Sequence, residues 1–114
     1  VIVTVPGIEG DMGILYNHIP IITFLKAGRI QIETSIKKFS FFISDGVLEF
    51  SNNILTILAS EIYEIQKIDS KIIKILQNKA QEKIGKKNSN DNEIFLANKF
   101  QEEVNLLSSF ISNS

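Results

Sequence analysis

The feature that most restricts the fold of this chain is a change of hydrophobic period near Ala59. Before that point, short runs of apolar and β-branched residues alternate with polar ones and are separated by Gly, Pro or Asn, which is typical of β-strands. After it, apolar residues recur with the period of an amphipathic helix. The sequence therefore predicts an N-terminal antiparallel β-sandwich over residues 1–60 and a C-terminal antiparallel helical hairpin over residues 61–114.

The β-rich part contains several short strands with recognisable faces. The clearest is Arg29–Glu33, in which Ile30 and Ile32 lie on one face and polar side chains on the other. Asp45–Gly46 and Asn52–Asn53 are predicted tight turns, because Gly and Asn tolerate a positive φ. Short antiparallel strands at this spacing favour a sandwich or a flattened barrel.

Two apolar stripes define the predicted helices. The first consists of Ile65, Ile68, Ile72, Ile75, Leu76 and Ala80, and the second of Leu96, Phe100, Val104, Leu107 and Ile111. Gly85 and the polar run after it end the first helix, and Asn90 with Glu93 forms a capping box for the second. Because such a hairpin buries only two stripes against each other, we expect it to be marginally stable alone and able to dock on, or leave, a larger surface.

Charge and residue usage exclude several classes of function. The 114 residues carry 12 Lys plus Arg against 13 Asp plus Glu, so no field of one sign favours nucleic acid or anionic lipid. With no Cys and one His, the chain cannot build a zinc site from several such ligands, and neither a metal nor a cofactor is predicted. The apolar run Ile19–Leu25 is far shorter than the ~20 residues of a spanning helix. No secretory signal is recognisable, so a cytoplasmic location is the default expectation.

The N-terminal region offers two kinds of candidate site. Gly7, Gly10 and Gly13 are spaced like a phosphate-binding loop, but no helical pattern follows them, so we interpret them as turn and strand-packing residues. Glu9 and Asp11 form a carboxylate pair, yet acid and base roles need unlike environments, and nothing around this Gly-rich segment promises burial. We interpret the pair as a solvated or partner-facing loop.

Two further groups of residues have polar side chains that a partner could contact. His18 has no identifiable Ser or Asp partner for a catalytic triad, so it is a polar loop residue, with partner contact as the alternative. Lys79, Lys83, Lys86 and Lys87 gather near the predicted hairpin tip. They are typical of a solvated helix end whose cations complement the macrodipole, with contact to an acidic partner as the alternative. Lacking interleaved aromatic residues, they do not predict nucleic-acid binding.

Dense, ordered stretches of the chain carry a family resemblance. They are Val5–Leu15 followed by His18, Pro20, Ile21–Thr23, Leu25 and Gly28, then Phe42–Phe50, and finally Ile54–Ala59. Together these stretches resemble the epsilon subunit family of bacterial-type ATP synthases. Phe42–Phe50 is similar to the family's next hairpin and Ile54–Ala59 to its last strand. The family's architecture, a β-sandwich followed by a helical hairpin, agrees with the two periods of the sequence.

The resemblance implies a non-catalytic rotor subunit of a proton-driven ATP synthase. Such a subunit lies in the central stalk, binds the gamma subunit and rests on the c-ring, peripheral to the cytoplasmic face of the inner membrane and touching the membrane only through the complex. The residues that match the ring-facing end of the family's sandwich are Glu9, Gly10, Asp11 and His18. The hairpin would extend along gamma, reach the alpha and beta subunits, and inhibit ATP hydrolysis.

Two departures from the family pattern accompany the resemblance. Relatives have further strands before the position matching Val1, so we expect an N-terminally incomplete sandwich with an uncovered edge and poor stability in isolation. Relatives that bind ATP on the hairpin carry Ile/Leu-Asp-x-x-Arg-Ala, whereas here Ile72 and Ile73 stand at the Arg and Ala positions. We therefore expect no nucleotide sensing.

Two other classes of function stay open on sequence grounds. The chain could be a generic β-sandwich protein-binding module with a helical tail, which would be found with a soluble partner. It could also be a small hydrolase that uses Glu9 and Asp11, which would lose activity in Asp11→Ala.

Overall fold

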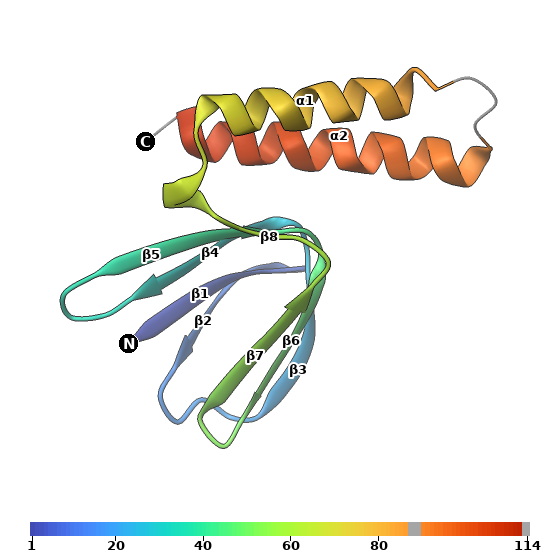
Figure 1. Cartoon of the computed structure of the whole chain (residues 1–114). Helices are drawn as coiled ribbons and strands as arrows, with labels where there is room; N and C mark the ends of the chain where they lie inside the picture. The colour runs from blue at the N-terminus through green and yellow to red at the C-terminus, as the bar shows by residue number, and fades with distance from the viewer. Residues whose placement is uncertain (87–89, 113–114) are drawn as a thin grey trace. The chain divides into compact units, whose positions relative to one another are not determined.

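The chain divides into two compact units, Val1–Lys67 and Ile68–Ser114. The structure is a computed structural model, and it describes residues 1–86 and 90–112. The first unit contains the strands and a short 3-10 helix, η1 (Ile65–Lys67), and the second contains two α-helices (Figure 1). The sequence placed the division after residue 60. The last strand and η1 lie against β5 and so belong with the strands.

The strand unit is an antiparallel arrangement of eight strands. These are β1 (Ile2–Gly7), β2 (Gly10–Leu15), β3 (Ile21–Leu25), β4 (Gly28–Glu33), β5 (Lys38–Ile43), β6 (Gly46–Ser51), β7 (Ile54–Ala59) and β8 (Ile62–Glu64). Their order is β7-β6-β3-β1-β4-β5-β8, and β2 pairs with β1 outside this path. In Figure 1 the sheet folds over on itself, with β4 and β5 in one wing and β3, β6 and β7 in the other. The predicted fold class, a β-sandwich followed by a helical hairpin, is confirmed.

Inward-facing side chains from both wings form one apolar core. Its buried members are Val5, Ile14, Leu25, Ile30, Ile43, Leu48 and Phe50. Because side chains alternate along a strand, the partly buried Ile32 shares the inner face of β4 with Ile30, as predicted for Arg29–Glu33. Burial of these side chains is the main favourable contribution to folding of the unit.

The two predicted turns have different outcomes. Asn52 and Asn53 reverse the chain between β6 and β7, with φ of 54° and 60°, so that prediction is confirmed. The prediction of a hairpin around Asp45–Gly46 is wrong, because β5 pairs with β4 and β8 whereas β6 pairs with β3 and β7. The chain crosses there between the two wings. Gly46 is needed because a Cβ at this position would collide with the carbonyl oxygen of Leu58.

The second unit consists of α1 (Ser70–Ile84) and α2 (Asp91–Ser112), which pack against each other. Asp69 caps α1, and its side chain accepts a hydrogen bond from the Ile72 amide at 3.0 Å. The predicted cap of α2 is confirmed, since the side chain of Asn90 accepts from the Glu93 amide at 2.7 Å. Within the described ranges, neither helix is long and apolar enough to cross a membrane.

The buried face of the hairpin differs from the predicted stripes. Its members are Ile73, Leu76, Ala80, Ala97, Val104 and Leu107. Ile75 and Leu96, which were expected inside, are 55% and 53% exposed, while Ile65 and Ile68 precede α1. Ile65 and Ile68 fall outside the helix because α1 begins only at Ser70, after the Asp69 cap, whereas Ile75 and Leu96 are exposed because the packing of α1 against α2 buries a different face of each helix. Ala80 and Ala97 have small side chains, which favour close packing of the helices.

Candidate functional site

A largely apolar sheet surface is one candidate site of the strand unit. We call it the outer face and define it by Ile22 and Phe24 of β3, Val47 and Glu49 of β6, and Ile54, Thr56 and Leu58 of β7. It exists because the alternate residues of the same strands, including Leu48, Phe50 and Ile57, point into the core. The two-residue alternation of side chains along these strands therefore produces both the buried core and the outer face.

Strand register brings the side chains of the outer face into rows. Phe24 pairs with Val47, which pairs with Leu58, and these three form an apolar row across β3, β6 and β7. Directly opposed residues in a sheet have Cβ atoms about 4.5–5.5 Å apart, so the row is contiguous. Phe24 is 65% exposed and Leu58 is 69% exposed.

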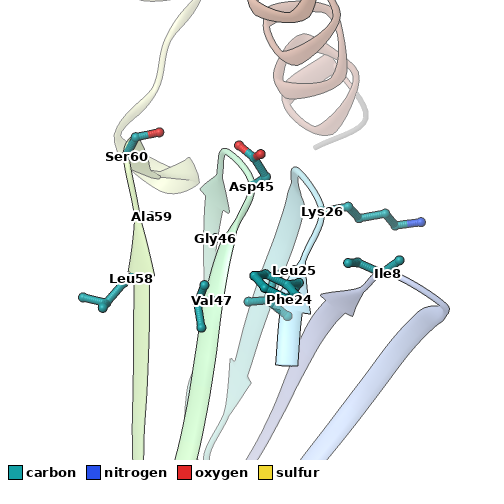
Figure 2. A pocket seen from close by; sticks show the side chains of 10 residues that line it. All are labelled: Ile8, Phe24, Leu25, Lys26, Asp45, Gly46, Val47, Leu58, Ala59 and Ser60. Atoms are coloured by element: carbon teal, nitrogen blue, oxygen red, sulfur yellow. The ribbon is translucent and has the colours of Figure 1, made fainter. Parts of the chain in front are cut away.

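The apolar row borders an open groove of about 710 Å³. Figure 2 shows Leu58, Val47 and Phe24 on three neighbouring strands, with Ile8 from the turn between β1 and β2 beyond them. Asp45 and Lys26 also line the groove. The groove is open and mostly apolar, so its chemistry suits contact with another apolar surface better than enclosure of a small molecule.

Glu49 is the charged member of the outer face. It lies in the row Ile22–Glu49–Thr56, which neighbours the apolar row. Its side chain is exposed, and no ion pair joins it to another residue in the described part of the chain. Among the residues that define the outer face, Glu49 alone is charged. The sequence did not single it out, because Glu49 is an ordinary polar position in an alternating strand.

The predicted site residues Glu9, Gly10 and Asp11 lie at one end of the β1–β2 hairpin. Gly7 pairs with Gly10, so Ile8 and Glu9 make the turn, and Asp11, the second residue of β2, lies opposite Pro6. The two carboxylate residues are exposed. Gly10 has a φ of 135°, which explains the glycine there. Neither carboxylate has the buried, unlike environment that acid and base catalysis requires.

The structure places His18 at the other end of the same hairpin. Its amide donates to the Leu15 carbonyl at 3.0 Å, and its ring packs edge-on against Phe50 with centroids 5.9 Å apart. The preceding Asn17 is tied to the β6–β7 turn, since its amide donates to the Asn53 side chain at 2.8 Å and its own side chain accepts from Asn53 at 3.3 Å. Asn17 and Asn53 were not predicted to support His18. Both have a positive φ, and the pair joins two turns.

The four predicted contact residues therefore do not gather into one cluster. Gly10 and Leu15 are the ends of β2, and five residue steps correspond to roughly 17 Å along a strand. The resemblance implied that the Glu9 turn and the His18 segment lie at the same end of the sandwich, and the strand register separates them. A partner that touches both must extend along β2, whose other edge pairs with no strand among the residues described.

The remaining candidates are a metal site and the lysines near the hairpin tip. Residues 1–86 and 90–112 contain no group of three or more His, Asp or Glu side chains placed to hold a metal ion. Among the lysines at the hairpin tip, Lys83 lies over the Phe100 ring, with Nζ 4.2 Å from the centroid. This contact is a cation–π interaction between the two helices. Lys87 lies outside the described residues.

Comparison with known proteins identifies similar chains. Residues 1–65 match the family described as ATP synthase, Delta/Epsilon chain, beta-sandwich domain. The ATP synthase epsilon chain of Pelagibacter ubique is 42% identical over 98 residues, which are 86% of this chain and 72% of that relative. The epsilon chain of Pelotomaculum thermopropionicum is 34% identical over 82 residues, 72% of this chain and 61% of that relative.

Solved structures share the fold at lower sequence identity. A chain in the Euglena gracilis mitochondrial ATP synthase, in a structure of OSCP, F1 and c-ring, matches with a TM-score of 0.74 and 20% identity. That match covers 97% of this chain and 69% of the other. A chain in the central stalk and c-ring of the Tetrahymena thermophila mitochondrial ATP synthase matches with a TM-score of 0.59 and 12% identity over 96% of this chain and 81% of that one.

Proposed function

Because the chain belongs to the ATP synthase delta/epsilon family, we propose that it is a central-stalk subunit that couples rotation of the c-ring to the catalytic head through the gamma subunit. Its similarity to epsilon chains, above all the 42% identity to the Pelagibacter ubique protein, carries this proposal. These relatives are a non-catalytic subunit of the complex, and this chain is not an enzyme. Protons are the proposed coupling ion.

We assign the ring-facing contact to β2 and its two ends. Glu9, Gly10 and Asp11 lie at one end and His18 at the other, so the c-ring would contact a surface roughly 17 Å long. Support comes from the exposure of both carboxylate residues and from the rigid hairpin that presents them. The chain would then lie at the cytoplasmic face of the inner membrane and touch the membrane only through the complex.

The helical hairpin is the proposed regulatory part. Two helices that share one narrow apolar seam are marginally stable alone, so a change of partner surface can move or unfold them at low cost. We propose that the hairpin contacts the alpha and beta subunits and inhibits ATP hydrolysis. ATP binding there is not proposed, because Ile72 and Ile73 stand at the Arg and Ala positions of the family motif, and Ile73 is buried in the hairpin.

Reconstitution tests the proposed function. The full chain is added to ATP synthase depleted of its epsilon subunit, and co-purification with gamma and proton-driven ATP synthesis are measured. We expect stable incorporation and restored ATP synthesis. Recovery of the chain only in soluble complexes without gamma would instead support a generic binding module.

The ring-facing assignment has its own variants. Asp11→Ala combined with His18→Ala removes one polar group from each end of β2 and should weaken coupling while the gamma contact persists. Glu33→Gln is the matched control, because this carboxylate lies on β4 in an exposed ion pair with Lys38 at 3.3 Å. Unchanged ATP synthesis in the double variant would argue against the assignment.

A further inference from the structure

We infer that the outer face binds a neighbouring protein surface that is itself apolar and presents one Lys or Arg side chain to Glu49. This inference rests on the proposed function, in which the chain works inside an assembly. The inference identifies which surface of the chain contacts the neighbouring protein, and it names Glu49 as the residue that determines which protein can bind there.

The first observation is the extent of the exposed apolar side chains. Ile22 and Phe24 of β3 are 75% and 65% exposed, Ile54 and Leu58 of β7 are 67% and 69% exposed, and they lie on the same face of the sheet on either side of β6. A contiguous exposed apolar patch on a folded protein marks an interaction site. The core residues beneath, including Leu48 with 0% exposure, hold the backbone of this face in a fixed geometry.

The second observation is the position of Glu49 within that patch. Ile22 and Thr56 lie directly opposite it on the neighbouring strands, and Val47 lies on the same face of β6. Phe24, Ile54 and Leu58 are its diagonal neighbours, close enough for long side chains to reach. An apolar partner surface laid over these side chains would therefore also cover the carboxylate.

Covering an unpaired carboxylate is costly. Removal of a charged group from water without a compensating charge is strongly unfavourable, and the penalty falls only when an oppositely charged group and hydrogen bonds replace the lost water. None of the residues that define the outer face is Lys or Arg, and Lys26, which lines the groove, lies four residues along the chain from Ile22, the residue opposite Glu49. The partner must therefore bring one, and Arg fits best because its planar guanidinium can bind a carboxylate through two hydrogen bonds.

A second copy of this chain does not meet that requirement. Packing two outer faces about a two-fold axis would place an apolar, anionic surface against an identical one. Each Glu49 would then lose water without gaining a cation. Charge complementarity thus favours a different chain of the assembly as the occupant.

Titration of the epsilon-depleted ATP synthase with the labelled full chain tests the inference. We expect Glu49→Gln to raise the Kd about 30-fold or more, because one partner of a desolvated charge pair is removed. Glu49→Lys should weaken binding further through repulsion of the cation. Phe24→Ser should weaken binding through loss of apolar contact. Glu33→Gln, which removes an exposed carboxylate from β4, should leave the Kd unchanged, and the fold of every variant is checked by circular dichroism.

The outcomes separate this inference from the function on which it rests. Tight binding of the wild type together with an unchanged Kd in Glu49→Gln overturns the cation requirement, and the subunit assignment survives. Failure of the wild type to bind the depleted assembly counts against both. A wild-type dimer in sedimentation that is lost in Phe24→Ser would assign the face to a second copy and also overturn the inference.

Discussion

Leu107→Ala is expected to unfold the helical hairpin while the strand unit keeps its structure. Leu107 is 1% exposed and lies in the buried face between α1 and α2 with Val104, Leu76 and Ala80. Truncation of a fully buried Leu costs about 2–5 kcal/mol, because the apolar contact is lost and a cavity remains. A cost of about 3 kcal/mol shifts an unfolding equilibrium roughly 150-fold.

Because the core of the hairpin is small, this change in the unfolding equilibrium should be enough to unfold it. Its remaining buried side chains are Ile73, Leu76, Ala80, Ala97 and Val104, two of which are alanines that contribute little apolar area. Helices of this length have little stability of their own and depend on packing. Far-UV circular dichroism should therefore lose most of its helical signal, and amide hydrogen exchange should show protection retained in the strands.

Leu96→Ala is the matched control on the same helix. Leu96 is 53% exposed, so the same chemical change should cost less than about 1 kcal/mol and leave the helical signal in place. If the apolar stripe predicted from the sequence were correct, the two variants would behave alike. Equal effects would refute the assignment of the buried face, and loss of strand protection together with the helices in Leu107→Ala would refute the separate unfolding of the two units.

Three further variants test local features of the fold by denaturant unfolding. Gly7→Ala should destabilise the strand unit by about 1–3 kcal/mol, because its Cβ would lie 2.6 Å from a backbone carbonyl, whereas Gly13→Ala, with its nearest contact at 3.7 Å, should be tolerated. Asn53→Ala should cost about 1–2 kcal/mol through loss of its bonds to Asn17 and strain at a φ of 60°, and Asn53→Gly should recover part of that loss. Asp69→Ala should lower the stability of the hairpin by about 1 kcal/mol, since it removes the cap of α1, and Asp69→Asn should keep most of that stability.

Local sequence signals were sufficient for the elements that depend on neighbouring residues. The period of two predicted the strand faces, as in Arg29–Glu33, and Asn52–Asn53 identified a real hairpin turn. Asn90 was recognised as a cap because its side chain acts on an amide only three residues away. In each case the interacting residues are close together in the sequence, so their types and spacing are sufficient to predict the interaction.

The buried face of each helix and the pairing of the strands could be determined only from the tertiary structure. The stripe that began at Ile65 failed at Ile75, because the face that a helix buries is selected by the packing of α1 against α2. Asp45–Gly46 looked like a hairpin turn, but whether β5 pairs with β6 is a choice between distant partners that no local signal contains. Strand pairing is non-local, and side-chain period alone leaves it undetermined.

The functional surfaces also depend partly on local sequence and partly on tertiary contacts. The sequence alone determined the family, the two units and the identity of the polar residues near the N-terminus, because each depends on residues in order along the chain. Only the tertiary structure shows that Glu9 and Asp11 lie far from His18 along β2. Only the strand register shows that apolar side chains from three strands lie around Glu49. The physical reason is that an interaction surface is a property of neighbours in space, and in a β-sandwich those neighbours are supplied by strands far apart in the chain.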